Sequence, residues 1–215
     1  ALGVKRAVIG VENNKPDAVA HLNDLIAKGN YRGIEVMPLK TRYPQGGEKQ
    51  LIAAVTGRQV PPPPALPISV GAVVCNASTS VAVYEAVQKN KPLIERVVTI
   101  TGKEVKDTHN YLLRFGTSVK SVIEAAGGLP EGDVKVLNGG PMMGRSVVNL
   151  DSPVMKGCSG ITVLSGCEAS RGKELSCIKC AKCVSACPMG LEPYLISKLA
   201  MKQLWDRAED HNIME

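Results

Sequence analysis

The sequence predicts an α/β protein: a domain of alternating strands and helices, then a small α+β unit, then a short helical segment rich in cysteine. Three observations support this prediction. Short β-branched runs alternate with helical patterns over residues 1–94, which is typical of a parallel or mixed sheet. After Pro92 the strands are instead grouped around one helix. Finally, four of the seven cysteines stand within residues 177–187.

The first domain, residues 1–94, is predicted to contain three strands, each dominated by β-branched and other apolar residues: Arg6–Val11, Ile34–Leu39 and Val70–Cys75. Three helices are expected to begin near Pro16, directly after Gly46-Gly47, and near Thr79. Their apolar stripes include Val19, Leu22, Leu25 and Ile26 in the first helix and Leu51, Ile52 and Val55 in the second. The prolines at 61–64 predict a stiff, extended connector.

The second unit, residues 95–148, is predicted to have three strands around one helix. The strands are expected at Glu95–Thr101, Asn110–Arg114 and Val134–Leu137, and the helix at Val119–Ala126. Residues 149–175 are rich in Gly and Ser and predict an irregular linker. Residues 176–215 complete the chain with the cysteine segment and an amphipathic helix from about Glu192 to Arg207.

Composition excludes several classes of protein. With 44% hydrophobic and 21% charged residues the chain has the balance of a folded globular protein. Its apolar runs are shorter than the roughly 20 residues of a membrane-spanning helix, so we expect a peripheral protein. The net charge is +6, but the basic residues are dispersed and there is only one Phe and one Trp. This pattern argues against a nucleic-acid module and leaves room for an acidic protein partner.

The cysteine segment carries the sharpest chemical signal. Cys177, Cys180, Cys183 and Cys187, followed by Pro188, have the spacing C-x2-C-x2-C-x3-C-P. Two-residue gaps let one tight loop wrap a cluster with three thiolates, and the fourth thiolate of such a run usually ligates a different cluster. The spacing therefore predicts a [4Fe–4S] site. Structural zinc is the alternative, but zinc sites typically separate two C-x2-C pairs by a longer spacer.

A second motif of this kind is absent from the 215 residues, so Cys187 has no partners for a second cluster here. Either Cys187 closes the first cluster, or the natural protein is longer than this sequence. The lack of an initiating Met also indicates a fragment. Cys75, Cys158 and Cys167 are expected to be buried or unremarkable thiols, and His21, His109 and His211 fit no ligand spacing.

Several motifs, taken together and in order, carry a resemblance to a known family. They are the runs at residues 9–16, 43–49, 56–58, 92–97 and 138–144, and the cysteine loop ending at Leu191. The chain resembles the C subunit of the Rnf electron-transport complex, whose flavin domain is similar to the flavoprotein subunit of respiratory complex I. The resemblance implies a partial complex-I-flavoprotein-like α/β domain, a β-grasp unit of the SLBB type and a ferredoxin-like iron–sulfur segment. It also implies that the family's glycine-rich phosphate loop precedes residue 1.

The resemblance further implies where cofactors bind. Flavin and nicotinamide contacts fall on Tyr43, Gly46, Gly47, Glu48 and Lys49, where Lys49 replaces a second acidic residue, and on Asn76 and Thr79 near the flavin phosphate. The physical chemistry agrees, since bare backbone at a helix start and polar residues after a strand are usual ligand positions. The bland alternatives are that Gly46-Gly47 is only a turn and Asn76 only a helix cap. The glycine-rich run Gly139–Gly144 is expected to be a tight turn packed by its own Met pair.

The function implied by the resemblance is electron transfer between NAD(H) and a ferredoxin-type carrier. It would use FMN and two [4Fe–4S] clusters in the full protein, docked on membrane subunits at the cytoplasmic side of the bacterial inner membrane. The sequence as given is expected to be inactive alone. One rival is a soluble flavin and iron–sulfur cobalamin reductase of a microcompartment. Another is a zinc-stabilised, non-catalytic interaction module.

Overall fold

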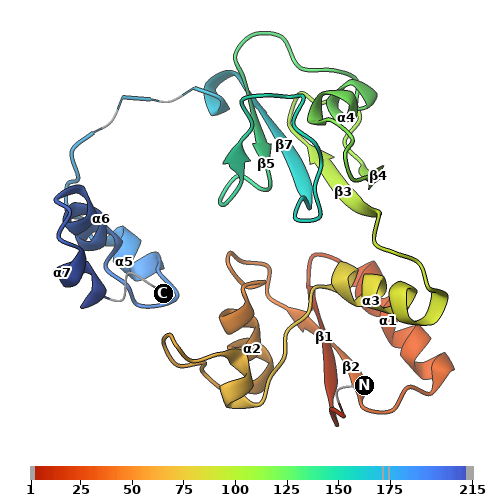
Figure 1. Cartoon of the computed structure of the whole chain (residues 1–215). Helices are drawn as coiled ribbons and strands as arrows, with labels where there is room; N and C mark the ends of the chain where they lie inside the picture. Colours follow the sequence, from red (N-terminus) through yellow and green to blue (C-terminus); the bar gives the residue numbers. More distant parts are fainter. Residues whose placement is uncertain (1–2, 171, 174, 212–215) are drawn as a thin grey trace. The chain divides into compact units, whose positions relative to one another are not determined.

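The computed structural model describes residues 3–170, 172–173 and 175–211, and the chain divides into two compact units (Figure 1). The first unit contains Ala1–Val74 together with Ser176–Glu215, and the second contains Cys75–Leu175. In the described part of the chain, no helix has the length and apolar character needed to cross a membrane.

A parallel pair of strands forms the sheet of the first unit. β1 (Ala7–Glu12) pairs with β2 (Ile34–Leu39) from Ala7 opposite Ile34 to Glu12 opposite Leu39. The crossover is α1 (Pro16–Gly29), which begins with the predicted early proline and ends at Asn30 in the left-handed conformation, with a φ of 47°. These three elements confirm the sequence prediction. In α1 the apolar stripe is only half-buried, and Leu25 remains 45% exposed.

The next helix, α2 (Glu48–Thr56), begins directly after Gly47 as predicted and buries Ile52. It packs over β1 at Gly10, where an added Cβ would lie 2.9 Å from Cδ1 of Leu39 and 3.1 Å from Cδ1 of Leu51. Glycine at this position therefore lets the Leu39 and Leu51 side chains lie directly on the strand backbone, and a larger residue would make both side chains shift. The first turn of α2 belongs to the candidate site that is described below.

The third predicted strand, Val70–Cys75, is wrong. A 3-10 turn, η1 (Pro67–Val70), ends at Gly71 with a φ of 71°, and the N–H of Ala72 donates back to the carbonyl of Pro67 over 3.2 Å. The backbone at the start of the predicted strand is thus hydrogen-bonded within a turn, and residues 70–75 pair with no strand that the structure describes. The expected extended proline connector is also wrong, because Ala65 N–H donates to the Pro62 carbonyl over 3.1 Å and the run turns.

The second unit begins with α3 (Ala77–Lys89) and contains a five-stranded sheet in the order β4-β3-β7-β5-β6. The strands are β3 (Glu95–Thr101), β4 (Asn110–Arg114), β5 (Val134–Asn138), β6 (Arg145–Ser146) and β7 (Gly160–Ser165). The helix α4 (Val119–Ala125) contributes Val119, Val122 and Ile123 to a core that also holds Val98, Ile100, Ile161 and Val163. The four predicted elements of this unit are confirmed.

The strand β7 corrects the expectation that residues 149–175 form an irregular linker. β7 is the central strand, parallel to β3 and antiparallel to β5, and Ile161 and Val163 are almost completely buried. Its ladder partners are about 25 to 60 positions away in the sequence. A strand with such distant partners is stabilised by the sheet and not by local sequence. The Gly- and Ser-rich segments on either side of β7 therefore made the whole region look like a linker.

The C-terminal part of the first unit contains α5 (Lys182–Ala186), α6 (Pro193–Met201) and α7 (Trp205–Glu209). The single helix expected from Glu192 to Arg207 is therefore wrong. It is interrupted at Gln203, which has a φ of 57°, while Leu204 N–H donates to the Leu199 carbonyl over 3.0 Å. The left-handed residue turns the chain, so that Leu199 and Ala208 are both buried.

Candidate functional site

The predicted flavin residues of the first unit lie on one loop and the first turn of α2. Gly47 N–H donates to the Pro44 carbonyl over 2.7 Å, and Leu51 N–H donates to the Gly47 carbonyl over 2.8 Å. Gly47 is thus held tightly, since an added Cβ would come within 2.8 Å of Oε1 of Gln50 and 3.0 Å of the Pro44 oxygen. Gly46 differs, because a Cβ there would meet no atom within 4 Å.

The environment of Gly46 suits approach by a planar ligand. Its backbone is exposed, and it precedes a helix whose first N–H groups have no partner within the helix. Tyr43 is 58% exposed beside it, and Glu48 supplies an exposed carboxylate in the first helical turn. The loop therefore brings Tyr43, Gly46, Gly47, Glu48 and Lys49 together, as a short sequence segment must.

A polar link that sequence reasoning missed joins the carboxyl ends of β1 and β2. Oδ1 of Asn13 accepts hydrogen bonds from the backbone N–H of Thr41, over 3.1 Å, and from the Thr41 hydroxyl, over 2.9 Å. Ligands of parallel α/β sheets bind outside the carboxyl ends of the strands. The motif at residues 9–16 already contained Asn13, but its partner lies 28 positions away and leaves no local signal.

Asn76 and Thr79 lie in the second unit, at the start of α3. Oδ1 of Asn76 accepts the N–H of Ser78 over 2.9 Å, so Asn76 is the N-cap of this helix. The cap interpretation of Asn76 is therefore confirmed, while its amide nitrogen has no part in the cap bond. Thr79 is exposed on the first turn. The two predicted groups of flavin contacts thus belong to different compact units.

The cysteine loop has an unusual backbone. Lys179 and Ala181 both have positive φ, 56° and 57°, although neither is glycine. The N–H of Lys179 donates to Sγ of Cys177 over 3.4 Å. Cys187 lies at the end of α5, where its N–H donates to the Val184 carbonyl over 3.1 Å and Pro188 follows. Cys177, Cys180 and Cys183 are exposed, and Cys187 is half-buried.

These residues fit an iron–sulfur cluster by donor chemistry and by backbone. Four thiols, left-handed residues inside the loop and an N–H···S bond are typical of loops that hold anionic centres. The four cysteine side chains do not converge on one point. Among the residues that the structure describes, no three His, Cys, Asp or Glu side chains form a group that could hold a metal ion. The four metal ligands therefore stay a prediction from the motif.

The other thiols divide into one buried and two exposed. Cys158 is 2% exposed within the core of the second unit, and burial raises the pKa of its thiol. Its Sγ lies 3.8 Å from the Gly160 carbonyl. Cys75 and Cys167 are exposed. The thiolate is the reactive form, so Cys158 is the least reactive of the three.

The turn Gly139–Gly144 is built as expected, but its Met pair is not packed. Gly144 N–H donates to the Gly140 carbonyl over 2.7 Å, and the Thr162 hydroxyl donates to the Gly139 carbonyl over 2.8 Å. Met142 and Met143 are 69% and 81% exposed. Hydrogen bonds to the backbone of the turn, one of them from the Thr162 hydroxyl, hold it in place of the Met side chains, which corrects the expectation that the Met pair packs the turn.

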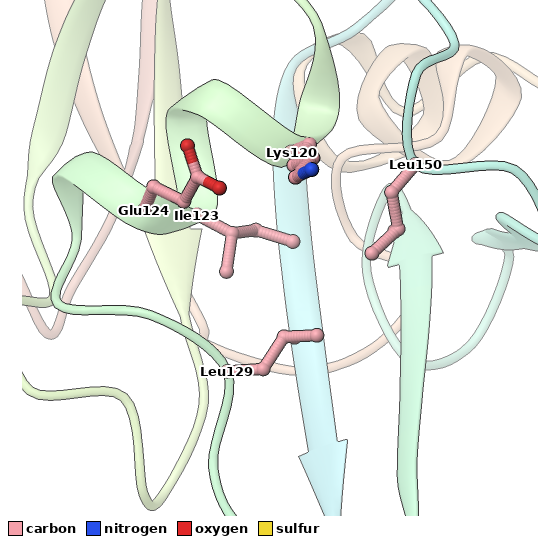
Figure 2. A pocket seen from close by; sticks show the side chains of 5 residues that line it. All are labelled: Lys120, Ile123, Glu124, Leu129 and Leu150. Atoms are coloured by element: carbon pink, nitrogen blue, oxygen red, sulfur yellow. The ribbon is translucent and has the colours of Figure 1, made fainter.

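A small hollow lies beside α4 in the second unit (Figure 2). Its volume is about 160 Å³, and it is lined by Lys120, Ile123, Glu124, Leu129 and Leu150. Sites for small molecules and cofactors usually measure about 300–1,000 Å³. The hollow is too small for a flavin or a nicotinamide nucleotide.

Comparison with known proteins assigns the two domain types. Residues 1–85 match the family model of the Nuo51 FMN-binding domain, and residues 97–146 match that of the SLBB domain. These matches define a flavoprotein-type α/β domain joined to a β-grasp-type unit and confirm the predicted fold class.

Relatives align along the whole chain. It is 45% identical to the C subunit of the proton-translocating ferredoxin:NAD(+) oxidoreductase complex of Clostridium ljungdahlii, over 100% of this chain and 46% of that protein. It is 43% identical to the C subunit of the Na(+)-translocating complex of Acetobacterium woodii, over 100% and 48%, and 40% identical to a C subunit from Rhodobacter capsulatus, over 90% and 37%. The chain thus spans about half the length of the first two relatives and 37% of the third. The resemblance to the C subunit of ion-translocating ferredoxin:NAD oxidoreductase complexes is confirmed.

Proposed function

We propose that this chain is the flavin and iron–sulfur part of an electron-transferring C subunit, working between NAD(H) and a ferredoxin-type carrier. The observation that carries the proposal is the 45% identity along the whole chain, which includes the C-x2-C-x2-C-x3-C-P loop. When bound, FMN exchanges hydride with a nicotinamide, and iron–sulfur clusters pass single electrons. The names of the relatives favour a membrane complex over a soluble cobalamin reductase.

In this proposal the protein supplies binding, orientation and electrostatics. The open backbone at Gly46 and the N-terminus of α2 receive the flavin, with Tyr43, Glu48 and Lys49 at its edge. For Asn76 and Thr79, the proposed contact with the flavin phosphate rests on the family resemblance alone. Cys177, Cys180 and Cys183 hold one cluster, and Cys187 ligates a second cluster whose other ligands belong to the full-length protein.

The test of the iron–sulfur part is anaerobic reconstitution of the full-length protein with iron and sulfide. We expect about four irons per closed cluster, and a low-temperature EPR signal after dithionite reduction. Replacing Cys177→Ser should remove one cluster, whereas the matched Cys167→Ser, also an exposed thiol, should leave the iron content unchanged. Stoichiometric zinc without reconstitution would instead support the zinc-stabilised interaction module.

The flavin part has its own variant. Gly46→Ala adds one methyl group in open space, so the fold tolerates it, but the methyl group would obstruct a ligand lying on this backbone. We expect FMN affinity to fall about tenfold, the effect of roughly 1.4 kcal/mol, with unchanged circular dichroism. An unchanged FMN affinity would show that Gly46-Gly47 is only a turn.

A further inference from the structure

A side-chain contact joins α2 to the cysteine segment within the first compact unit. Nε2 of Gln50 lies 2.8 Å from Sδ of Met189, which is 139 positions away in the sequence, and donates a hydrogen bond to it. Both side chains are half-buried. Gln50 follows residues 43–49, which we call the flavin loop, and Met189 follows the last cysteine of the proposed cluster motif. The contact therefore connects the two segments that the proposed function uses.

The Gln50 amide also touches the flavin loop. A Cβ added at Gly47 would come within 2.8 Å of Oε1 of Gln50, so this oxygen lies close to the Gly47 backbone. Gly47 is itself fixed, because its N–H donates to the Pro44 carbonyl over 2.7 Å. A thioether has no proton to donate, so the amide must direct its nitrogen toward Met189 and its oxygen toward Gly47. One planar group thus contacts both segments.

Met189 shares a short turn with Cys187. Gly190 N–H donates to the Cys187 carbonyl over 3.3 Å, and the ring of Pro188 fixes φ inside this turn. On the other side, Cys187 N–H donates to the Val184 carbonyl over 3.1 Å. Because the backbone is hydrogen-bonded on both sides of the turn, an anchor on the Met189 side chain also restrains Cys187.

Resting on the proposed function, we propose that Gln50 is a positioning residue that couples the flavin loop to the proposed ligand Cys187. In an iron-loaded cysteine segment the turn at Met189 is ordered, and its contact with Gln50 holds the Gly47 backbone in the conformation that receives a flavin. Such coupling is reciprocal, because two ligands that stabilise the same arrangement raise each other's affinity by the same factor.

The test compares the FMN affinity of the full-length protein before and after anaerobic reconstitution of its clusters. We expect reconstitution to lower the Kd for FMN about fivefold. Gln50→Met removes the amide donor at similar length, and Met189→Leu removes the sulfur acceptor at similar volume. Each variant should abolish the difference between the two Kd values. The double variant should show no further loss, because residues that act through one contact are not additive.

The matched controls are Gln59→Met and Met201→Leu, which make the same replacements at exposed positions of the first unit. Both controls should keep the full effect of reconstitution on FMN affinity. Hydrogen exchange of peptides that cover residues 187–191 tests the anchor by itself, on iron-loaded protein without FMN. Exchange should be faster in Gln50→Met and in Met189→Leu than in the controls.

Three results would overturn the proposal. In the first, the natural protein binds iron and FMN, but reconstitution leaves its FMN affinity unchanged. In the second, Gln50→Met weakens FMN binding equally with and without clusters, so that Gln50 is only part of the flavin site. In the third, residues 187–191 exchange at the same rate in the variants and the controls. Failure of the proposed function is distinguishable, because the natural protein would then take up no iron or no FMN, and the coupling would fall with it.

Discussion

The backbone N–H of Lys179 donates a hydrogen bond to Sγ of Cys177 over 3.4 Å, from a residue with a φ of 56°. Hydrogen bonds to cysteine sulfur are one means by which a protein tunes an iron–sulfur centre. The left-handed conformation directs this N–H back toward the sulfur two residues earlier. A non-glycine residue in that conformation costs about 1–2 kcal/mol.

Substitutions at Lys179 should follow backbone preference. Lys179→Gly removes the left-handed cost but adds about 0.5–1 kcal/mol of chain entropy, so the loop should be as stable as before or slightly more stable. Lys179→Val removes the same positive charge as Lys179→Gly, but a β-branched residue disfavours the left-handed conformation more than lysine does. We therefore expect the reconstituted Lys179→Val protein to lose iron to a chelator at least tenfold faster than the Lys179→Gly protein. At Lys182, which is helical, Ala should retain iron better than Gly. Equal iron loss for Gly and Val at position 179 would contradict this account.

The turn between β5 and β6 predicts a second pair of outcomes. A Cβ at Gly144 would lie 2.5 Å from the Gly140 carbonyl oxygen and 3.0 Å from the Gly139 carbonyl carbon, both backbone atoms. Gly144→Ala should therefore destabilise the second unit by about 1–3 kcal/mol. Gly140→Ala, where a Cβ meets nothing within 4 Å, should change stability by less than about 0.5 kcal/mol. Hydrogen exchange of peptides from β5 and β7 measures this difference, and equal protection in both variants would contradict it.

Local signals explain which elements the sequence could predict. The starts of α2, α3 and α4 were predicted to within two residues, because the signals that begin a helix, such as Gly47 and Asn76, lie in the turn beside it. The strand Val70–Cys75 had the right residues but no partner strand, whereas β7 had partners too far away in the sequence to suggest it. Strand formation depends on such distant pairing more than helix formation does.

In the candidate site, too, the features with a local sequence signal were predicted and the others were not. The cysteine loop was readable because its four ligands lie within eleven residues, and spacing alone carries the chemistry. The bond between Asn13 and Thr41 was not readable, since the fold brings them together across β1 and β2. The left-handed residues at Lys179, Ala181 and Gln203 were also hidden, because the sequence shows no glycine at these positions.

Cys158 predicts how the thiols differ in reactivity and how stability depends on pH. Its burial raises the thiol pKa, so the folded state favours the protonated form. This contribution is complete below the unfolded pKa of about 8.5 and is lost as the pH rises through the higher folded value. Native-state alkylation followed by mass spectrometry should label Cys75 and Cys167 well before Cys158. Cys158→Ala should be less stable at neutral pH but lose less stability between about pH 7 and pH 10; an identical pH slope would contradict this assignment.

Asn76 offers a way to separate a helix cap from a ligand contact. Its Oδ1 accepts the Ser78 N–H over 2.9 Å, and Asp fills the same cap role as well as Asn does. Asn76→Asp should therefore preserve α3, but a carboxylate near a flavin phosphate adds repulsion and replaces the amide N–H donor. We expect the FMN affinity of the full-length protein to fall about tenfold or more, with unchanged circular dichroism. Asn76→Ser also keeps the cap but adds no charge. Its FMN affinity should therefore lie between that of the natural protein and that of Asn76→Asp. If Asn76→Asp binds FMN as the natural protein does, Asn76 is a cap alone, and the phosphate contact at the start of α3 must be abandoned.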